Sequence, residues 1–399
     1  MKIADGVSII IPTLNGGEEF RQCLKAIAGQ RLMRESQLII IDSGSEDGSV
    51  ELARQYGACL IHIPPGDFHH ARTRNLAVRN AVFPNIIMSV QDAILENENC
   101  IEDMVNALDN YDIVALTGRQ MPRSDADLYA RFEVDYHNEY LGDKSSIKNI
   151  SSEKWYSSLS YHEALQLIRF DNVIAAYKQK ELINTPFPEV PFGEDMAWAK
   201  KIMLQGHSLL YLPSIRVIHS HNRSTDYRFR RAMVDSISSA NIVGKTREDL
   251  SFLELPDIER INIKIKNELE KLKYEVSSVQ GMEYNNNTDK RILFRNFIST
   301  HLPISKNLYY KARTMLGKVN YRVWEELYVS TAKARAIFII SQITSRYSGY
   351  TNNDLVKAID HVAASIQGSL FGDVYASHRL KGNIPSELEN YVSFQKLGV

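Results

Sequence analysis

Short apolar runs alternate with amphipathic stretches along the first third of the chain. Four nearly continuous apolar runs are the strand candidates, at residues 7–11, 38–41, 59–63 and 86–90. Continuous hydrophobicity is typical of parallel strands buried on both faces, and apolar residues from Phe20 to Ile27 recur at helical spacing between the first two runs. Strands joined by crossover helices predict an α/β domain with a mostly parallel, Rossmann-like sheet.

The next segments are less regular. Residues 123–170 are polar and aromatic without a clear period, which predicts an inserted, partly helical segment. Regular structure resumes near Phe192, with a helix through Met196 and Ala199 and a strand at residues 208–211.

The period becomes helical in the second half of the chain. Apolar residues there step by three and four, as at Ile258, Ile261 and Ile265. This spacing places the apolar side chains on one face of each helix. We therefore predict an α/β domain over residues 1–225 and an α-helical accessory domain over residues 226–399.

Composition narrows the class of protein. The chain has 399 residues, of which 44% are hydrophobic and 24% charged. This length fits two domains, and this balance excludes a disordered, collagen-like or disulfide-scaffold protein. No apolar run approaches the ~20 residues of a membrane-spanning helix, and the first residues lack the features of a signal peptide. We therefore expect a cytoplasmic protein whose three cysteines, Cys23, Cys59 and Cys100, are buried, reduced thiols.

Charge is unevenly distributed, although the net charge is −1. Residues 1–225 carry 22 Lys and Arg against 29 Asp and Glu, and the remainder carries 25 against 19. The excess lies in residues 306–346, which hold eight basic residues, two acidic ones and several aromatic rings. This stretch is typical of a surface for anionic lipid or nucleic acid, or of a solvated helix face. Nucleic acid is disfavoured because the acidic first domain repels a polyanion.

Polar residues follow the first two predicted strands, at the sheet edge where parallel strands place their ligands. Asn15 follows the first strand, and the second runs into Asp42 and the small residues 43–45. A carboxylate there accepts hydrogen bonds from a pyrimidine imide or from ribose hydroxyls, and small residues let the backbone approach a nucleotide. The alternative is a tight turn, with Asp47 capping the next helix.

Two further groups lie near the third and fourth strands. Residues 66–75 form a loop that runs into a helix start and contains Arg72 and Arg74. These guanidinium groups offer donors to a diphosphate, or one of them pairs with a surface carboxylate. Asp92 directly follows the fourth strand, where it either holds a divalent cation that bridges phosphates or caps a helix.

The last group is Glu194 and Asp195 at a helix start, followed by His219 and His221. Paired acids at a helix start are favourable neighbours of the helix dipole, and beneath a Pro-rich approach one of them can instead serve as a general base in a cleft. The two histidines alternate along an extended segment, so they point to opposite faces and at most one is expected to reach a cation.

Together these groups resemble the family 2 inverting glycosyltransferases of GT-A fold, over about residues 6–225. The matching segments are residues 7–15, 39–48, 74–75, 91–93, 194–195 and 219–221. One departure is Val90, which stands where the family's metal motif usually has the first of two aspartates. Residues 91–93, with residues 42–45 and 170–177, are most similar to the branch that transfers rhamnose from dTDP-rhamnose during polysaccharide assembly.

The resemblance implies a metal-dependent, inverting hexosyltransferase that uses a nucleotide-sugar donor. It implies that Asp195 is the general base, and that Asp92 with His219 or His221 holds a divalent cation, Mn or Mg. The implied donor-binding residues are Pro12, Thr13, Asn15, Asp42, Ser45, Arg72, Arg74 and Gln91. The implied acceptor-binding residues are Glu194 and Trp198.

The resemblance further implies a glycan or lipid-linked acceptor in O-antigen or capsule biosynthesis, reached from the cytoplasmic face of the inner membrane. Residues 306–346 would then bind anionic lipid peripherally, with Trp324 at the headgroup level. Two alternatives stay open: the same chemistry with another donor such as a UDP-hexose, and a non-catalytic sugar-nucleotide or glycan-binding scaffold, which Val90 favours. The sequence leaves the linkage position and the oligomeric state open.

Overall fold

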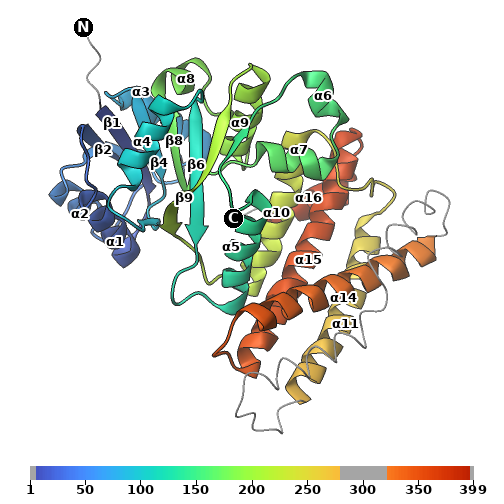
Figure 1. Ribbon diagram of the computed structural model, residues 1–399. Coiled ribbons are helices and arrows are strands. Elements are labelled where there is room, and N and C mark those ends of the chain that lie inside the picture. The colour runs from blue at the N-terminus through green and yellow to red at the C-terminus, as the bar shows by residue number, and fades with distance from the viewer. Residues whose placement is uncertain (1–5, 279–320, 396–399) are drawn as a thin grey trace. The chain divides into compact units, whose positions relative to one another are not determined.

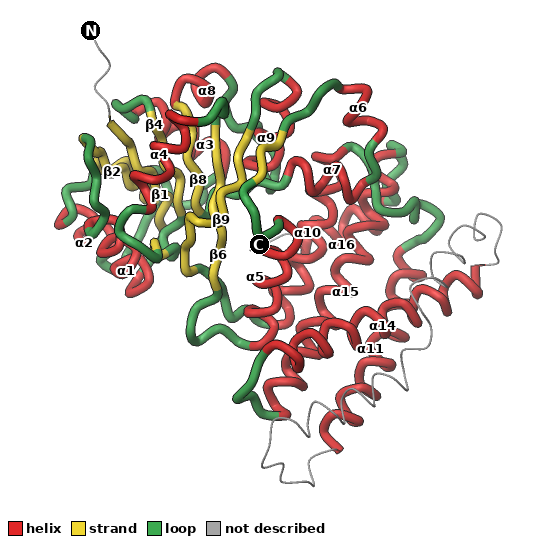
Figure 2. The backbone as a smooth tube through the Cα atoms, viewed as in Figure 1, coloured by secondary structure: helices red, strands yellow, loops and turns green. Residues whose placement is uncertain are grey.

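The computed structural model describes residues 6–278 and 321–395, which form two units (Figure 1). The first unit holds the described residues up to Ser124 together with Val134–Ser220, and the second holds Asp125–Glu133 together with the described residues from His221 onward. Strands and helices alternate in the first unit, and the second is helical (Figure 2). The predicted fold class, an α/β domain of GT-A type followed by a helical region, is confirmed.

One half of the sheet in the first unit is parallel and contains the four predicted strands. They are β1 (Gly6–Thr13), β2 (Glu35–Asp42), β3 (Cys59–His62) and β4 (Asn85–Ser89), in the order β3-β2-β1-β4. Their crossover helices are α1 (Gly17–Ala28), α2 (Ser49–Gln55) and α3 (His70–Asn80). Because these strands are parallel, the loops that follow them meet at one edge of the sheet.

The other half of the sheet is mixed. Here β8 (Ile174–Lys178) lies antiparallel between β4 and β6 (Ala115–Met121), and β6 is parallel to β9 (Leu209–Ile218). Two short strands, β5 (Ile94–Leu95) and β7 (Ser146–Lys148), pair antiparallel with β9. The other helices of the first unit are α4 (Cys100–Asn110), α6 (Glu153–Ser158), α7 (Tyr161–Ile168), α8 (Gln179–Asn184) and α9 (Glu194–Leu204). Residues 123–170 are partly helical, as predicted.

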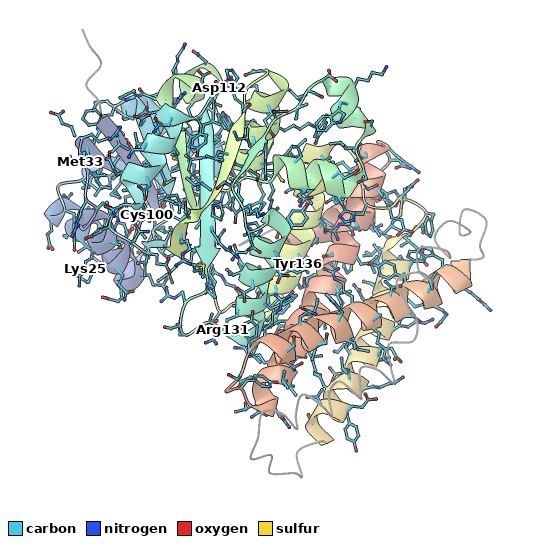
Figure 3. The ribbon with its side chains drawn as sticks, viewed as in Figure 1. Lys25, Met33, Cys100, Asp112, Arg131 and Tyr136 are labelled. Atoms are coloured by element: carbon cyan, nitrogen blue, oxygen red, sulfur yellow. The ribbon has the colours of Figure 1, made fainter. Side chains whose placement is uncertain are left out.

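The core of the first unit lies between the sheet and its helices. Cys100 on α4 is fully buried, whereas Lys25 on α1 is exposed (Figure 3). Cys23, also on α1, is fully buried, and its thiol donates to the carbonyl oxygen of Val90 over 3.6 Å. Cys59 is exposed because β3 is an edge strand, so the prediction of three buried thiols is wrong at this residue. None of the three cysteines forms a disulfide.

The second unit consists of helices around one apolar core. They are α10 (Thr225–Val243), α11 (Leu255–Ser278), α14 (Tyr321–Arg346), α15 (Asn352–Leu380) and α16 (Ser386–Gln395). The periodic residues Ile258, Ile261 and Ile265 are buried, as their spacing predicts. Leu128 and Phe132, at the start of α5 (Leu128–Leu141), belong to the same core.

Two glycines allow α10 and α15 to approach closely. A Cβ on Gly368 would lie 2.0 Å from the carbonyl oxygen of Phe229, and one on Gly372 would lie 2.5 Å from the carbonyl oxygen of Met233. Backbone atoms cannot move aside as a flexible side chain can. Any larger residue at either position therefore forces the two helices apart.

The stretch predicted to bind anionic lipid, residues 306–346, is only partly described. Four of its basic residues lie outside the described residues: Lys306, Lys311, Arg313 and Lys318. Trp324 is only 7% exposed and packs edge-on against Phe252, so the prediction that it lies at the headgroup level is wrong. Lys333 pairs with Glu268 over 2.8 Å. Within residues 6–278 and 321–395, no helix has both the length and the apolarity needed to cross a membrane.

Candidate active site

The loops that follow β1 and β2 are joined by side-chain hydrogen bonds. Asn15 adopts a left-handed backbone conformation, with φ of 47°. Its backbone N–H donates to Ser45 Oγ over 2.9 Å, and its Oδ1 accepts from the backbone N–H of Glu46 over 2.8 Å. The N–H of Gly17 donates to Asp47 Oδ2 over 2.8 Å. These contacts hold both loops in one arrangement at the carboxyl edge of the sheet.

Gln91 joins the loop after β4 to the same arrangement. Its Oε1 accepts from the backbone N–H of Leu14 over 2.8 Å, and its Nε2 donates to the carbonyl oxygen of Leu14 over 3.1 Å. β1 ends with Pro12 and Thr13, and the Thr13 carbonyl accepts from the N–H of Ser43 over 3.1 Å. The structure therefore brings together five predicted donor-binding residues: Pro12, Thr13, Asn15, Ser45 and Gln91.

Asp42 forms the tight turn that was one of its two predicted roles. It is 2% exposed and accepts from the backbone N–H of Gly44 over 3.0 Å and of Ser45 over 3.2 Å. His62 Nδ1 lies 3.6 Å from its Oδ2. These donors fix the carboxylate at the end of β2, between the two loops.

Arg72 and Arg74 have different environments, although both lie on α3. The Arg72 side chain is 60% exposed and lies 4.0 Å from the equally exposed Glu189. The Arg74 side chain is 5% exposed, and its Nη1 donates to Glu194 Oε1 over 2.7 Å. Arg72 is therefore the arginine that pairs with a surface carboxylate, one of the two predicted roles. The guanidinium of Arg74 faces a buried carboxylate instead of open solvent, so its predicted contact with a diphosphate is replaced by an internal ion pair.

Glu194 and Asp195 begin α9 and face different partners. Glu194 is buried, and besides Arg74 it accepts from Asn172 Nδ2 over 3.3 Å. Its predicted contact with an acceptor is therefore replaced by these internal bonds. Asp195 is only partly buried. Its Oδ1 accepts from the N–H of Met196 over 2.7 Å, and its Oδ2 accepts from the N–H of Asn172 over 3.1 Å.

The environment of Asp195 changes its acidity. Burial, followed by the negative charges of Glu194 and Asp171, raises the pKa of Asp195 to about 7, against the opposing effect of Arg74. A carboxylate with a pKa near neutrality can take up a proton at physiological pH. The carboxyl group of Asp195 can therefore exchange a proton near neutral pH.

Trp198 corrects another prediction. Its side chain is fully buried, and its Nε1 donates to the carbonyl oxygen of Thr185 over 2.7 Å. It packs among the rings of Phe170, Tyr177 and Phe187. An acceptor cannot contact a side chain without exposed surface, so the predicted acceptor-binding role of Trp198 is wrong.

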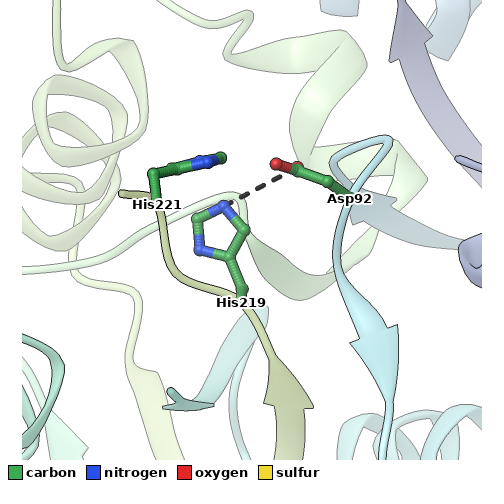
Figure 4. Close-up of side chains that lie close together, drawn as sticks. All are labelled: Asp92, His219 and His221. Carbon is green, nitrogen blue, oxygen red and sulfur yellow. Dashed lines mark ion pairs between the residues drawn. The ribbon is translucent and has the colours of Figure 1, made fainter. Parts of the chain in front are cut away.

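Asp92, His219 and His221 lie close together (Figure 4). Potential ligand atoms of all three lie within 4.8 Å of one another, and His219 Nε2 is 3.7 Å from Asp92 Oδ1. His221 directly follows Ser220, the last residue of the first unit, and therefore belongs to the same local segment as His219. The prediction that at most one histidine reaches the site is wrong because β9 ends at Ile218, so strand alternation does not apply beyond it.

This group suits a divalent cation. A carboxylate oxygen and two imidazole nitrogens form a mixed donor set that transition metals such as Mn²⁺ accept. All three side chains are partly buried, so each keeps some exposed surface. The residues present therefore fit the cation that the resemblance implies.

Four polar residues near this edge were not among the predicted site residues: Gln120, His137, Asp171 and Asn172. Gln120 Oε1 lies 2.9 Å from His219 Nδ1, and Gln120 Nε2 donates to Asp171 Oδ2 over 3.4 Å. His137 Nε2 lies 3.5 Å from the same oxygen of Asp171. Asp171 and Asn172 lie in residues 170–177, which the sequence analysis used only for the family resemblance. Gln120 and His137 belong to no recognisable motif.

Comparisons with known proteins identify the family of the chain. Residues 8–171 match the family described as Glycosyl transferase family 2. The chain is 32% identical to the O-antigen chain rhamnosyltransferase WbaN of Salmonella anatum over 233 residues, which cover 56% of this chain and 69% of that protein. It is 34% identical to the O-antigen chain rhamnosyltransferase RfbN of Salmonella typhimurium over 230 residues, with the same coverage.

Two solved structures are also similar. One is the mannosyltransferase PcManGT from Pyrobaculum calidifontis in complex with GDP-Man and Mn²⁺, with 19% identity and a TM-score of 0.42 over 57% of this chain and 61% of that one. The other is residues 1–349 of S. aureus TarS in complex with UDP, with 11% identity and a TM-score of 0.42 over 95% of this chain and 92% of that one. The sequence matches confirm the predicted family: the chain belongs to glycosyl transferase family 2 and is a glycosyltransferase.

Proposed function

We propose that this glycosyltransferase inverts the configuration of the sugar it transfers, and that it moves L-rhamnose from dTDP-rhamnose to a glycan or lipid-linked acceptor of a cell-surface polysaccharide. The observation that carries the chemistry is Asp195, a partly exposed carboxylate at the start of α9 whose pKa is raised to about 7. The choice of sugar is supported by the two relatives, both named as O-antigen chain rhamnosyltransferases.

Asp195 is the proposed general base. Each of its oxygens already accepts one backbone N–H, from Met196 or Asn172, which orients the carboxylate and leaves lone pairs for an acceptor hydroxyl. Asp195 takes the proton of that hydroxyl while the hydroxyl oxygen attacks the anomeric carbon from the face opposite the nucleotide. The bond to the diphosphate breaks, and a β-linked donor gives an α-rhamnoside.

The nucleotide is proposed to lie over the loops after β1 and β2. Hydrogen bonds of Asn15, Ser45 and Gln91 hold these loops in place before the donor binds, which reduces the entropy lost on binding. Asp42, at the end of β2, is the proposed contact to the nucleotide base, as the family resemblance implies. Arg72 is the arginine that suits the diphosphate, because its pairing with Glu189 is long and exposed and therefore weak.

Asp92, His219 and His221 would hold a divalent cation, Mn or Mg, and this cation when bound offsets the negative charge of the departing diphosphate. Two imidazole ligands favour Mn²⁺ over Mg²⁺, which prefers oxygen. Asp92 supplies the carboxylate of the set from the loop after β4, while the histidines follow β9.

The acceptor is proposed to be lipid-linked and to be reached at the cytoplasmic face of the membrane. Support comes from the basic excess of residues 306–346. Among the described part of this stretch, Arg322 and Arg346 are exposed. Each exposed basic residue near an anionic leaflet contributes about 1 kcal/mol to binding.

A donor panel tests the proposed function. The full chain is incubated with a lipid-linked glycan acceptor and, in turn, dTDP-rhamnose, UDP-glucose and UDP-galactose, and the release of nucleoside diphosphate and the anomeric configuration of the product are measured. We expect transfer from dTDP-rhamnose with inversion. Transfer from a UDP-hexose instead would contradict the proposed donor, and retention of configuration would contradict the mechanism.

Asp195→Asn tests the general base. The variant should lose about 10²–10⁴-fold in transfer rate because it cannot take up the proton, while donor binding stays nearly unchanged. Asp112→Asn is the matched control, because Asp112 is exposed and precedes β6, at the opposite edge of the sheet. Transfer by Asp195→Asn at the rate of the control would exclude Asp195 as the base.

A further inference from the structure

Gln120 connects the candidate cation site with a partly buried carboxylate, that of Asp171. It lies on β6, with its Oε1 2.9 Å from His219 Nδ1 and its Nε2 3.4 Å from Asp171 Oδ2. Both ends of the amide are thereby used, one toward a histidine and one toward an acid. All three residues belong to the first unit, so their arrangement is local to it.

Asp171 has a fixed position and a fixed charge. Its Oδ1 accepts from the backbone N–H of Val173 over 3.2 Å, and His137 Nε2 lies 3.5 Å from its Oδ2. Burial raises the pKa of Asp171, but the interactions with His137, the charge of Arg169 and the hydrogen bond from the Val173 N–H together outweigh it, so the pKa is lowered overall. Asp171 therefore remains a carboxylate at neutral pH, and a carboxylate can only accept hydrogen bonds.

This property orients the amide of Gln120. Only the NH₂ end of an amide can donate to a carboxylate, so that end must face Asp171 and the carbonyl oxygen must face His219. A carbonyl oxygen only accepts, so His219 Nδ1 must carry the proton. The backbone is held as well, since Asn138 Nδ2 donates to the Gln120 carbonyl over 2.8 Å and the His219 N–H donates to the Met121 carbonyl over 2.8 Å.

The other nitrogen of His219 is then determined. In a neutral imidazole only one nitrogen is protonated, so a proton on Nδ1 leaves a lone pair on Nε2. That Nε2 is the atom 3.7 Å from Asp92 Oδ1. We infer that Gln120 is a positioning residue, which fixes His219 in the Nδ1–H tautomer and thereby presents its Nε2 lone pair to a cation beside Asp92.

This inference rests on the proposed cation site and adds to it Gln120, which the family resemblance did not indicate, together with a role for Asp171. Partners that orient a ligating histidine typically change metal affinity by about 10–100-fold when they are removed. Gln120 does not touch the cation, so its effect passes through His219. Asp171 determines this arrangement, because its carboxylate can only accept hydrogen bonds and therefore selects the orientation of the Gln120 amide.

The tautomer is measured directly by long-range ¹H–¹⁵N NMR of the full chain, without metal or donor, at about pH 8, where an ordinary histidine is neutral. The chain has 11 histidines, so the His219 signals are identified by their loss in His219→Gln. We expect a protonated Nδ1 and an unprotonated Nε2 in the wild type, and a mixture of tautomers in Gln120→Leu. A wild-type His219 that carries its proton on Nε2 would overturn the inference.

Binding of Mn²⁺ is measured on the same proteins by calorimetry. We expect Gln120→Leu to bind Mn²⁺ about 10–100-fold more weakly than the wild type. Gln179→Leu is the matched control, because Gln179 is also partly buried and its Nε2 also makes two hydrogen bonds, to the carbonyls of Val78 and Ala81. Equal Mn²⁺ affinity in Gln120→Leu and Gln179→Leu would overturn the inference.

Asp171→Asn provides a second variant of nearly unchanged shape. Its amide can donate as well as accept, so it no longer selects one orientation of Gln120, and we expect the tautomer preference of His219 to weaken. An unchanged preference would overturn the role given to Asp171. Neither measurement requires a sugar donor, so a failed donor panel with intact tautomer and Mn²⁺ results would refute the proposed function alone.

Discussion

Replacing Arg74 with methionine is expected to lower the free energy of unfolding. The Arg74 and Glu194 side chains are each 5% exposed, and Nη1 and Oε1 lie 2.7 Å apart. Removing one partner of a buried pair leaves the other charge without compensation and costs about 3–5 kcal/mol. Methionine is unbranched and fills irregular space, so most of this loss comes from the charge of Glu194 and little from a cavity.

The same variant should shift the pH dependence of transfer. Burial raises the pKa of Asp195 to about 7, with the charges of Glu194 and Asp171 adding to the effect and Arg74 opposing it. Without Arg74 this pKa rises further, so a smaller fraction of Asp195 is deprotonated at neutral pH. A general base acts in its deprotonated form, and the rising limb of the rate against pH therefore moves to higher pH.

Urea unfolding and the pH–rate profile measure the two effects. Arg72→Met is the stability control, because Arg72 lies on the same helix but its 4.0 Å pair with Glu189 is exposed, and such pairs contribute about 0–1 kcal/mol. Adding Glu194→Gln to Arg74→Met should restore much of the stability, since no charge then stays buried. A loss for Arg74→Met no larger than that of Arg72→Met, or a limb that does not move, would refute the reasoning.

Three further predictions concern other parts of the chain. Asp92→Ala should weaken Mn²⁺ binding measured by calorimetry, because the two histidines alone offer no carboxylate to the cation, and unchanged binding would exclude this ligand. Gly368→Ala should destabilise by about 1–3 kcal/mol in urea unfolding, because its Cβ meets the Phe229 carbonyl at 2.0 Å, and wild-type stability would show that the helices can separate without cost. In co-sedimentation, the protein should bind anionic but not neutral vesicles, more weakly at high salt or after charge reversal within residues 306–346, and binding that ignores lipid charge would leave this stretch a solvated helix face.

Much of the fold could be predicted because its strands have a simple pattern. The four parallel strands are continuous apolar runs. Because the carboxyl ends of parallel strands lie at one edge of the sheet, the loops there bring Asn15, Ser45 and Gln91 together. What escaped prediction depends on pairing between distant segments. Gln120 and Asp171 meet because β8 inserts antiparallel between β4 and β6, and no local pattern specifies that insertion.

Burial and local geometry account for the remaining differences. Trp198 and Arg74 are polar-tipped side chains on helices, and helical spacing alone does not indicate that one packs among aromatic rings and the other against Glu194. The histidines after β9 depart from strand alternation because the strand ends one residue earlier. Leu128 lies in the core of the helical unit, although its sequence neighbours belong to the stretch with no clear period.

Because Cys23 is buried, the rate at which its thiol is alkylated in the wild-type protein measures local opening of the structure near the candidate cation site. A thiol reacts with alkylating reagents as the thiolate, and burial raises the pKa of Cys23 to about 12, so the closed protein offers a thiol that is neither accessible nor ionised. Alkylation then proceeds only in molecules where α1 has separated from the segment that leads to Asp92. When reclosing is fast, the labelling rate is the opening equilibrium constant multiplied by the rate of an exposed thiol, and Cys59 supplies that reference rate in the same molecule.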